Sequence, residues 1–266
     1  YFEEHASPDA KAKNLLGARI KLGALLSLAG DLEASAAVLD VVERELVASG
    51  DQATLATVLS SRAIAARRRR DFGEAARAFE RAIAAYEAAG TYRGATVPGP
   101  AQDVLRAMAD LALNQLSDSA RARDYYLRAL GFAQQPAARA SLLLSLARVA
   151  RRRGELTEAA SRAEAAGEAA RAGKLRGVAL EALIESTNIA WYRGDLAQGR
   201  QLCTRSLEEA EVQLAAARSN RLNSTLGEER SLIYALSVCG LVEMSSGDFV
   251  AAERTLLSAI RRAERR

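Results

Sequence analysis

The chain has 266 residues, of which 49% are hydrophobic but only 5% are aromatic, and it contains 4 prolines. Its net charge of +4, from 37 basic and 33 acidic residues, is a modest excess that argues against a dedicated nucleic-acid binder. No stretch approaches the roughly 20 apolar residues of a membrane span. Alanine and leucine favour helices whose outer faces Arg and Glu can solvate, so we expect an all-α protein.

In chain order, the apolar periodicity predicts six pairs of helices. The expected spans are 9–29 with 32–49, 51–69 with 72–89, 101–116 with 119–133, 136–153 with 156–172, 175–193 with 196–217, and 230–246 with 249–265. They define repeats at about 9–50, 51–90, 100–134, 135–173, 174–217 and 229–266. Two prolines and two glycines in 91–100 predict the longest loop. The stretch 219–229 adds residues before the last pair, either as an elongated helix or as an excursion from the array.

A marker residue followed by an acid opens the second helix of each pair. The markers are residues 30, 70, 117, 154, 194 and 247, so successive units are 40, 47, 37, 40 and 53 residues apart. After the marker at 70, small residues at Ala75 and Ala82 flank the large apolar Phe79, and this arrangement recurs down the chain. Such a period is typical of stacked helical units. The acids at Asp31, Asp71, Asp118, Asp195 and Asp248 are expected to cap helices rather than to catalyse.

This motif resembles the second helix of a tetratricopeptide repeat. Small residues also stand seven positions before four of the markers, where that family packs its two helices closely: Gly23, Ala63, Ala147 and Gly240. The resemblance implies a right-handed α-solenoid of six antiparallel helix pairs, continuous over 1–266. Two features depart from the family: the unit is nearer 40 than 34 residues, and Asp110 occupies a small-residue position. The longer unit is similar to the arrays of bacterial MalT-like regulators, so we interpret the chain as a piece of a larger protein.

The residues that common catalytic sites require are missing from the predicted array. The single histidine is His5, near the start of the chain, so nucleophile activation by histidine has no partner there. We therefore predict no enzymatic activity, no cofactor and no metal site. Cys203 and Cys239 fall at inward helix positions and are expected to be unbridged core thiols of a cytoplasmic protein.

The family resemblance implies that the first helices line a concave groove that binds a partner. The residues at those inner positions are Arg67, Arg68, Asn114, Gln115, Arg148, Arg151, Arg152, Asn188, Trp191 and Tyr192. Arginine and aromatic residues often dominate interface energies, which favours a binding surface. Two simpler interpretations stay open. Arginines in a last helical turn complement its negative end and remain in water, and Trp191 could belong to the core between repeats.

We therefore expect a non-enzymatic interaction scaffold whose partly basic groove binds a protein or an acidic peptide. One alternative is a ligand- or peptide-sensing domain of a bacterial transcriptional or signalling regulator. A weaker alternative is binding of a nucleic-acid backbone by the arginine clusters at 67–70 and 151–153. Strongly salt-dependent affinity without preference among partners would favour that last function.

Overall fold

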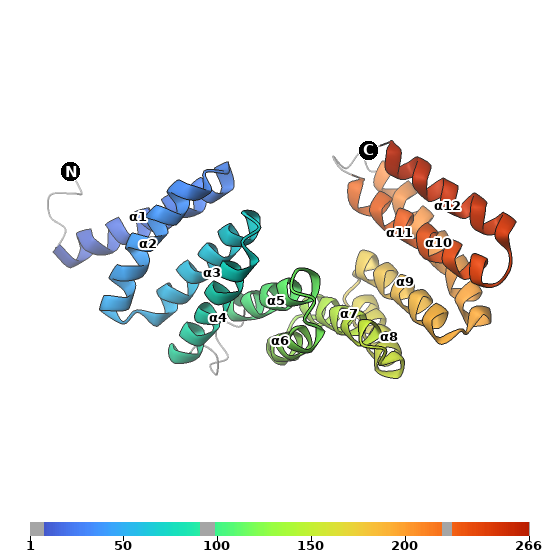
Figure 1. The fold of residues 1–266 in the computed structure, drawn as a ribbon, viewed down its shortest axis with the longest axis horizontal. Coiled ribbons are helices and arrows are strands. Elements are labelled where there is room, and N and C mark those ends of the chain that lie inside the picture. The colour runs from blue at the N-terminus through green and yellow to red at the C-terminus, as the bar shows by residue number, and fades with distance from the viewer. Residues whose placement is uncertain (1–7, 91–98, 220–224, 266) are drawn as a thin grey trace. The chain divides into compact units, whose positions relative to one another are not determined.

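A computed structural model describes residues 8–90, 99–219 and 225–265, and in these ranges it contains twelve α-helices and no strand (Figure 1). The helices are α1 (Pro8–Ala29), α2 (Leu32–Ser49), α3 (Gln52–Arg68), α4 (Phe72–Ala88), α5 (Gly99–Asn114), α6 (Ser119–Phe132), α7 (Pro136–Arg152), α8 (Leu156–Ala172), α9 (Arg176–Arg193), α10 (Leu196–Ser219), α11 (Leu226–Ser245) and α12 (Phe249–Glu264). The all-α prediction is confirmed, and the six expected pairs are present.

The chain divides into two compact units, Tyr1–Phe132 and Ala133–Arg266. Unit one holds α1 to α6 and unit two holds α7 to α12, and in both units consecutive helices pack as antiparallel pairs (Figure 1). Neighbouring pairs within a unit also pack on one another, for example α2 on α3 and α8 on α9. This is the stacked architecture of an α-solenoid. The continuity of one solenoid over 1–266 stays a prediction.

The turn inside each pair explains why the marker recurs. All six marker residues adopt a left-handed backbone with φ between 54° and 88°: Gly30, Arg70, Ser117, Gly154, Gly194 and Gly247. Glycine adopts this conformation without strain, and it is the usual residue at such a helix end. The following aspartates cap the second helices as predicted. Each accepts a hydrogen bond from the backbone N–H three residues later, as Asp71 does from Glu74 at 2.9 Å.

The small residues seven positions before the markers lie where two helices approach closely. A Cβ added at Gly240 would lie 2.5 Å from Cγ of Leu256, and one added at Gly23 would lie 2.7 Å from Cδ2 of Leu39. One of the exceptions at this position, Asp110, has a specific partner, since it accepts a hydrogen bond from the hydroxyl of buried Tyr126. A carboxylate and a phenol thus replace the usual small and apolar pair.

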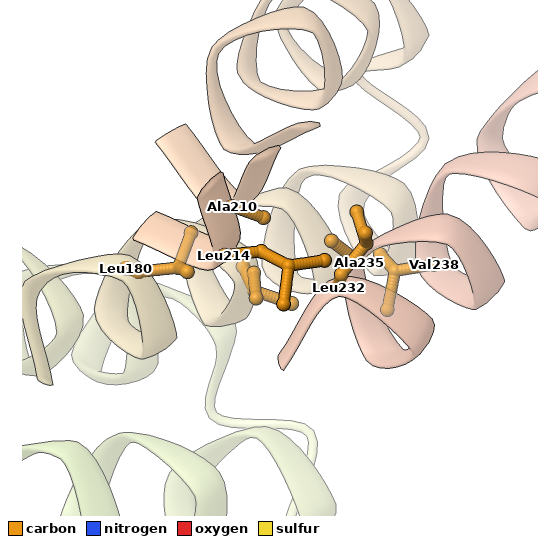
Figure 2. Packing of buried hydrophobic residues seen from close by; sticks show 7 residues of the cluster. Leu180, Ala210, Leu214, Leu232, Ala235 and Val238 are labelled. Atoms are coloured by element: carbon orange, nitrogen blue, oxygen red, sulfur yellow. The ribbon is translucent and has the colours of Figure 1, made fainter. Parts of the chain in front are cut away.

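Apolar side chains from three helices join the fifth and sixth pairs. Leu180 of α9, Leu214 of α10 and Leu232 of α11 meet in one buried cluster (Figure 2). Such contacts between neighbouring pairs hold a helical array together, because no single pair can bury its apolar face alone.

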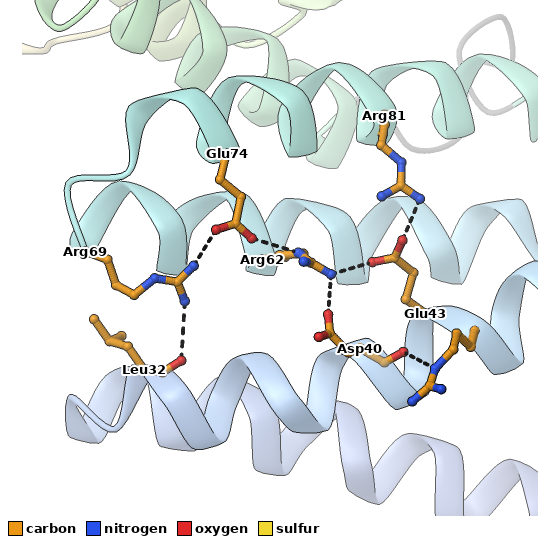
Figure 3. Close-up of polar contacts among 8 residues, drawn as sticks. Leu32, Asp40, Glu43, Arg62, Arg69, Glu74 and Arg81 are labelled. Atoms are coloured by element: carbon orange, nitrogen blue, oxygen red, sulfur yellow. Dashed lines mark hydrogen bonds and ion pairs between the residues drawn. The ribbon is translucent and has the colours of Figure 1, made fainter.

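A charged network joins the first pair to the second in unit one. Arg62 on α3 pairs with Asp40 and Glu43 on α2 and with Glu74 on α4 (Figure 3). Burial alone would lower the pKa of Arg62, but the hydrogen bond to Glu74 and the three carboxylate charges raise it above its ordinary value. The guanidinium therefore stays charged and links three helices.

The sequence-based prediction for the cysteines is wrong in one respect. Cys203 on α10 and Cys239 on α11 are buried, as expected, but they form a disulfide, with their Cα atoms 5.4 Å apart. Both cysteines lie within the irregular step of 53 residues between the markers at 194 and 247. The repeat pattern therefore did not reveal that these inward positions face each other. A Cα separation of this size is within the ordinary range for a disulfide.

The structure describes only parts of the two segments, 219–229 and 91–100, that were predicted to be irregular. α10 extends to Ser219 and α11 begins at Leu226, which favours elongated helices over an excursion between them. The centre of this segment, 220–224, lies outside the described residues. Most of the loop expected at 91–100 also lies outside them, and α5 begins at Gly99.

Substitution of Ala75 by tryptophan tests the helix crossing in the second pair. Ala75 on α4 is 0% exposed, so Ala75→Trp should overfill the crossing and lower the free energy of unfolding by about 1–3 kcal/mol. Ala84→Trp is the control, since Ala84 is exposed on the same helix. Urea unfolding of both variants measures the difference. Equal stability of the two variants would contradict the close packing at Ala75.

Candidate functional site

A buried charge pair lies on the side of unit two formed by the first helices of its pairs, α7, α9 and α11, which we call the first-helix wall. Glu185 on α9 is 0% exposed, and its Oε1 accepts a hydrogen bond of 2.6 Å from Nε of Arg151 on α7. Burial alone would lower the pKa of Arg151, but this hydrogen bond and the charge of Glu185 raise it. The guanidinium of Arg151 therefore stays charged, and the contact fixes α7 against α9.

A second arginine of α7 neutralises the rest of the acidic charge. Arg148 donates a hydrogen bond of 2.9 Å from Nη2 to Glu181, and its Nε lies 3.8 Å from Oε2 of Glu185. The sequence predicted Arg148 and Arg151 as part of a basic surface. The structure instead pairs both with carboxylates, so neither presents an uncompensated charge. Arg152, also predicted, is exposed in the last turn of α7.

Polar contacts continue from α9 to α11. Asn188 Nδ2 donates a hydrogen bond of 2.8 Å to the hydroxyl oxygen of Tyr234. Burial raises the pKa of Tyr234, and the nearby charge of Glu185 raises it further. The phenol is therefore neutral over the physiological pH range and accepts from Asn188 while keeping its own proton to donate.

Aromatic side chains at the end of α9 extend this surface into solvent. Tyr192 is 51% exposed, its ring lies 4.7 Å from that of Trp191 in an edge arrangement, and Arg151 Cζ lies 5.1 Å from its centroid. Trp191 is held in place by two contacts. Its Nε1 donates a 2.8 Å hydrogen bond to Ser245, and its side chain packs against the cluster that contains the disulfide. Trp191 thus packs on the core, as one of the two sequence-based interpretations expected, while its role in binding stays a prediction.

We call this set of residues the Arg151 cluster. Its members are Arg148, Arg151, Glu181, Glu185, Asn188, Trp191, Tyr192 and Tyr234. Three of them were missed by the sequence analysis. Glu181 and Tyr234 both stand thirteen residues before a marker, an inner position of the family groove, so the register alone could have identified them. Glu185 stands nine before its marker, outside that register, and only the packing of α7 on α9 reveals its role.

The remaining predicted residues lie in unit one. Arg67, Asn114 and Gln115 line a cavity of about 380 Å³ at the ends of α3 and α5, together with Arg70 and Asp110. Arg68 does not line this cavity, because its Nη1 donates a 2.8 Å hydrogen bond to the carbonyl of Ser27 on α1. The guanidinium of Arg68 therefore connects two first helices.

The described ranges lack the features of two other kinds of site. Across 8–90, 99–219 and 225–265, no three His, Cys, Asp or Glu side chains gather in a way that could hold a metal ion. No helix in the same ranges has the length and apolar character needed to cross a membrane. His5 lies outside these ranges.

Comparison with known proteins supports the fold. No protein-family model and no curated protein sequence matches the chain. Among solved structures, a signal-transduction ATPase with a tetratricopeptide-repeat sensor from Pyrococcus horikoshii matches with a TM-score of 0.68 and 14% identity, over 92% of this chain and 35% of that one. BtubC from P. vanneervenii matches with a TM-score of 0.62 and 16% identity, over 94% and 91% of the two chains. Tetratricopeptide-like repeats of a Podosopora anserina kinesin light chain give 0.60 and 13%, over 77% and 96%. The chain thus has a tetratricopeptide-repeat-like fold.

Proposed function

We propose that this chain is a non-catalytic interaction module that binds a protein segment on the first-helix wall of unit two. The observation that carries the proposal is the half-exposed ring of Tyr192, held between Trp191 and the guanidinium of Arg151. Aromatic and arginine side chains that are already fixed in place lose little entropy on binding, and these residue types dominate interface energies.

The charge balance of the Arg151 cluster defines the kind of segment expected. Arg148 and Arg151 are paired with Glu181 and Glu185, so attraction to acidic groups cannot be the main source of affinity at this position. The bound segment should place an apolar or aromatic side chain on Tyr192. Its backbone or polar groups can accept a hydrogen bond from the hydroxyl of Tyr234, whose own acceptor site is used by Asn188.

The finer features of this proposal concern its setting. An acidic segment as the partner, with exposed Arg152 as a contact beside the Arg151 cluster, and a cytoplasmic bacterial regulator as the parent protein are parts of it. Support for a regulator as the parent protein comes from the structural match to an ATPase whose tetratricopeptide repeats are described as a sensor. The disulfide between Cys203 and Cys239 argues against the cytoplasmic part of this proposal, because cytosolic thiols are normally kept reduced.

Selection from a displayed library of random peptides tests the binding surface. Peptides enriched on the wild-type chain should bind the Tyr192→Ala variant about 30-fold more weakly, the equivalent of roughly 2 kcal/mol for a central aromatic contact. Phe249→Ala is the matched control, since Phe249 is an exposed aromatic residue on α12 that is not a member of the Arg151 cluster. Equal binding to the wild type and to Tyr192→Ala would contradict the proposed site.

A further inference from the structure

A furrow on the other side of unit two lies between α8 and α10, with α9 between them. Its larger cavity has a volume of about 760 Å³, and an adjoining cavity of about 320 Å³ shares Arg171, Ala179, Leu183 and Arg205 with it. We call these two cavities together the α8–α10 furrow. None of the residues that line it belongs to the Arg151 cluster, so the two surfaces can be altered independently.

The wall of the larger cavity is mainly apolar. Leu175, Ala179, Leu183 and Val212 line it, and Val212 is 52% exposed although it is a β-branched apolar residue. A cavity of 300–1,000 Å³ with an apolar wall and a few convergent polar groups is typical of small-molecule sites. A ligand that covered this wall would remove apolar surface from water and thereby gain affinity.

Three cations around the same cavity have no partner among the residues that the structure describes. The side chains of Arg171, Lys174 and Arg205 make no hydrogen bond or ion pair in the described part of the chain. Two carboxylates also line the cavity, Glu208 and Glu209. Glu209 is already engaged, since it accepts a 2.8 Å hydrogen bond from Gln213 and lies 3.4 Å from Arg176. The balance of charge in the larger cavity is therefore positive.

The backbone of Lys174 supports a role for this cation. Lys174 follows the end of α8 with φ of 57°, a left-handed conformation that is occupied by glycine at the ends of α2 and α4, at Gly50 and Gly90. A lysine at such a position is strained relative to glycine, as Arg70 and Ser117 are at the turns within their pairs. Here it accompanies a charged side chain on the rim of a cavity.

We propose that the α8–α10 furrow binds a small anionic amphiphile, that is, a molecule with one acidic head group and an apolar body. The apolar body would cover Leu175, Ala179, Leu183 and Val212, and the head group would pair with Arg171, Lys174 and Arg205. This function is additional to protein binding on the first-helix wall. It places a small-molecule site and a protein-binding surface on opposite sides of the same helix, α9.

The test uses decanoate as the probe, with uncharged decanol as the matched control ligand. Isothermal titration of the full chain should show saturable binding of one decanoate, at least tenfold tighter than binding of decanol. Ala179→Trp, which fills the furrow, should abolish binding of both ligands. Arg171→Gln combined with Arg205→Gln should weaken decanoate binding at least tenfold and leave decanol binding unchanged. This double variant keeps the test valid if Ala179→Trp does not fold.

Two further variants separate the possible outcomes. Lys174→Gly should weaken decanoate binding while raising the melting temperature, because it removes both the charge and the backbone strain. Tyr192→Ala should leave decanoate binding unchanged, which separates failure of this site from failure of the first-helix wall. The proposal is overturned if no saturable decanoate binding occurs or if the arginine variant binds as tightly as the wild type. Binding of an acidic amphipathic peptide that Ala179→Trp abolishes, in the absence of saturable decanoate binding, would assign the furrow to a protein helix instead.

Discussion

Replacing Arg151 by methionine should lower the free energy of unfolding of unit two by about 3–5 kcal/mol. Glu185 is fully buried, and its Oε2 has no hydrogen-bond partner even with Arg151 in place. Without Arg151 its charge would be left with only Arg148, whose Nε is 3.8 Å away. A buried carboxylate without a close partner must either stay charged in a poorly polar environment or take up a proton, and both lower stability.

A double variant and a surface pair provide the controls for this experiment. Arg151→Met combined with Glu185→Leu removes both charges and should recover most of the lost stability, because apolar replacements of buried ion pairs are often neutral. Arg153→Met breaks the pair between Arg153 and Glu155, whose side chains are both about one-third exposed, and should cost no more than about 1 kcal/mol. Urea unfolding, followed through the transition of unit two, measures all three. If Arg151→Met costs as little as Arg153→Met, the buried pair does not hold α7 against α9.

The second large effect concerns the disulfide between α10 and α11. Changing Cys203 and Cys239 together to alanine should lower the free energy of unfolding by about 3–4 kcal/mol, because the bond closes a loop across a sequence separation of 36 residues. Most of this loss reflects the greater freedom of the unfolded chain. Trp191 is partly buried against the same cluster, and its packing should loosen as well, so the fluorescence of this single tryptophan should report the change.

Reduction of the wild type supplies the control for the cysteine variant. A reductant should destabilise the wild type by a similar amount and leave the double alanine variant unchanged. Two alkylated thiols in wild-type protein, trapped at lysis and detected by mass spectrometry, would contradict a disulfide in the cell and would agree with the cytoplasmic setting. A disulfide that persists under the same trapping would remove the support for that setting.

The candidate site was predictable only where its residues follow the repeat. Arg151, Asn188 and Tyr192 stand in the register of the first helices, and Tyr234 and Glu181 share that register although they were not singled out. The electrostatic state of the site was not predictable in this way. The repeat register predicts which side of the helix a residue lies on. A pair such as Arg151 with Glu185 depends instead on how closely α7 and α9 pack, and the two residues are 34 positions apart in the chain.

The sequence by itself determined the helix pairs, their turns and their caps, because these depend on local chemistry. Left-handed marker residues and capping aspartates act within a few residues of their own positions. Only the tertiary structure decided that Cys203 meets Cys239, that Asp110 binds Tyr126, and that Arg148 and Arg151 are neutralised. Each of these contacts joins different helices, and so it depends on how those helices pack, which the helical periodicity of either one does not specify.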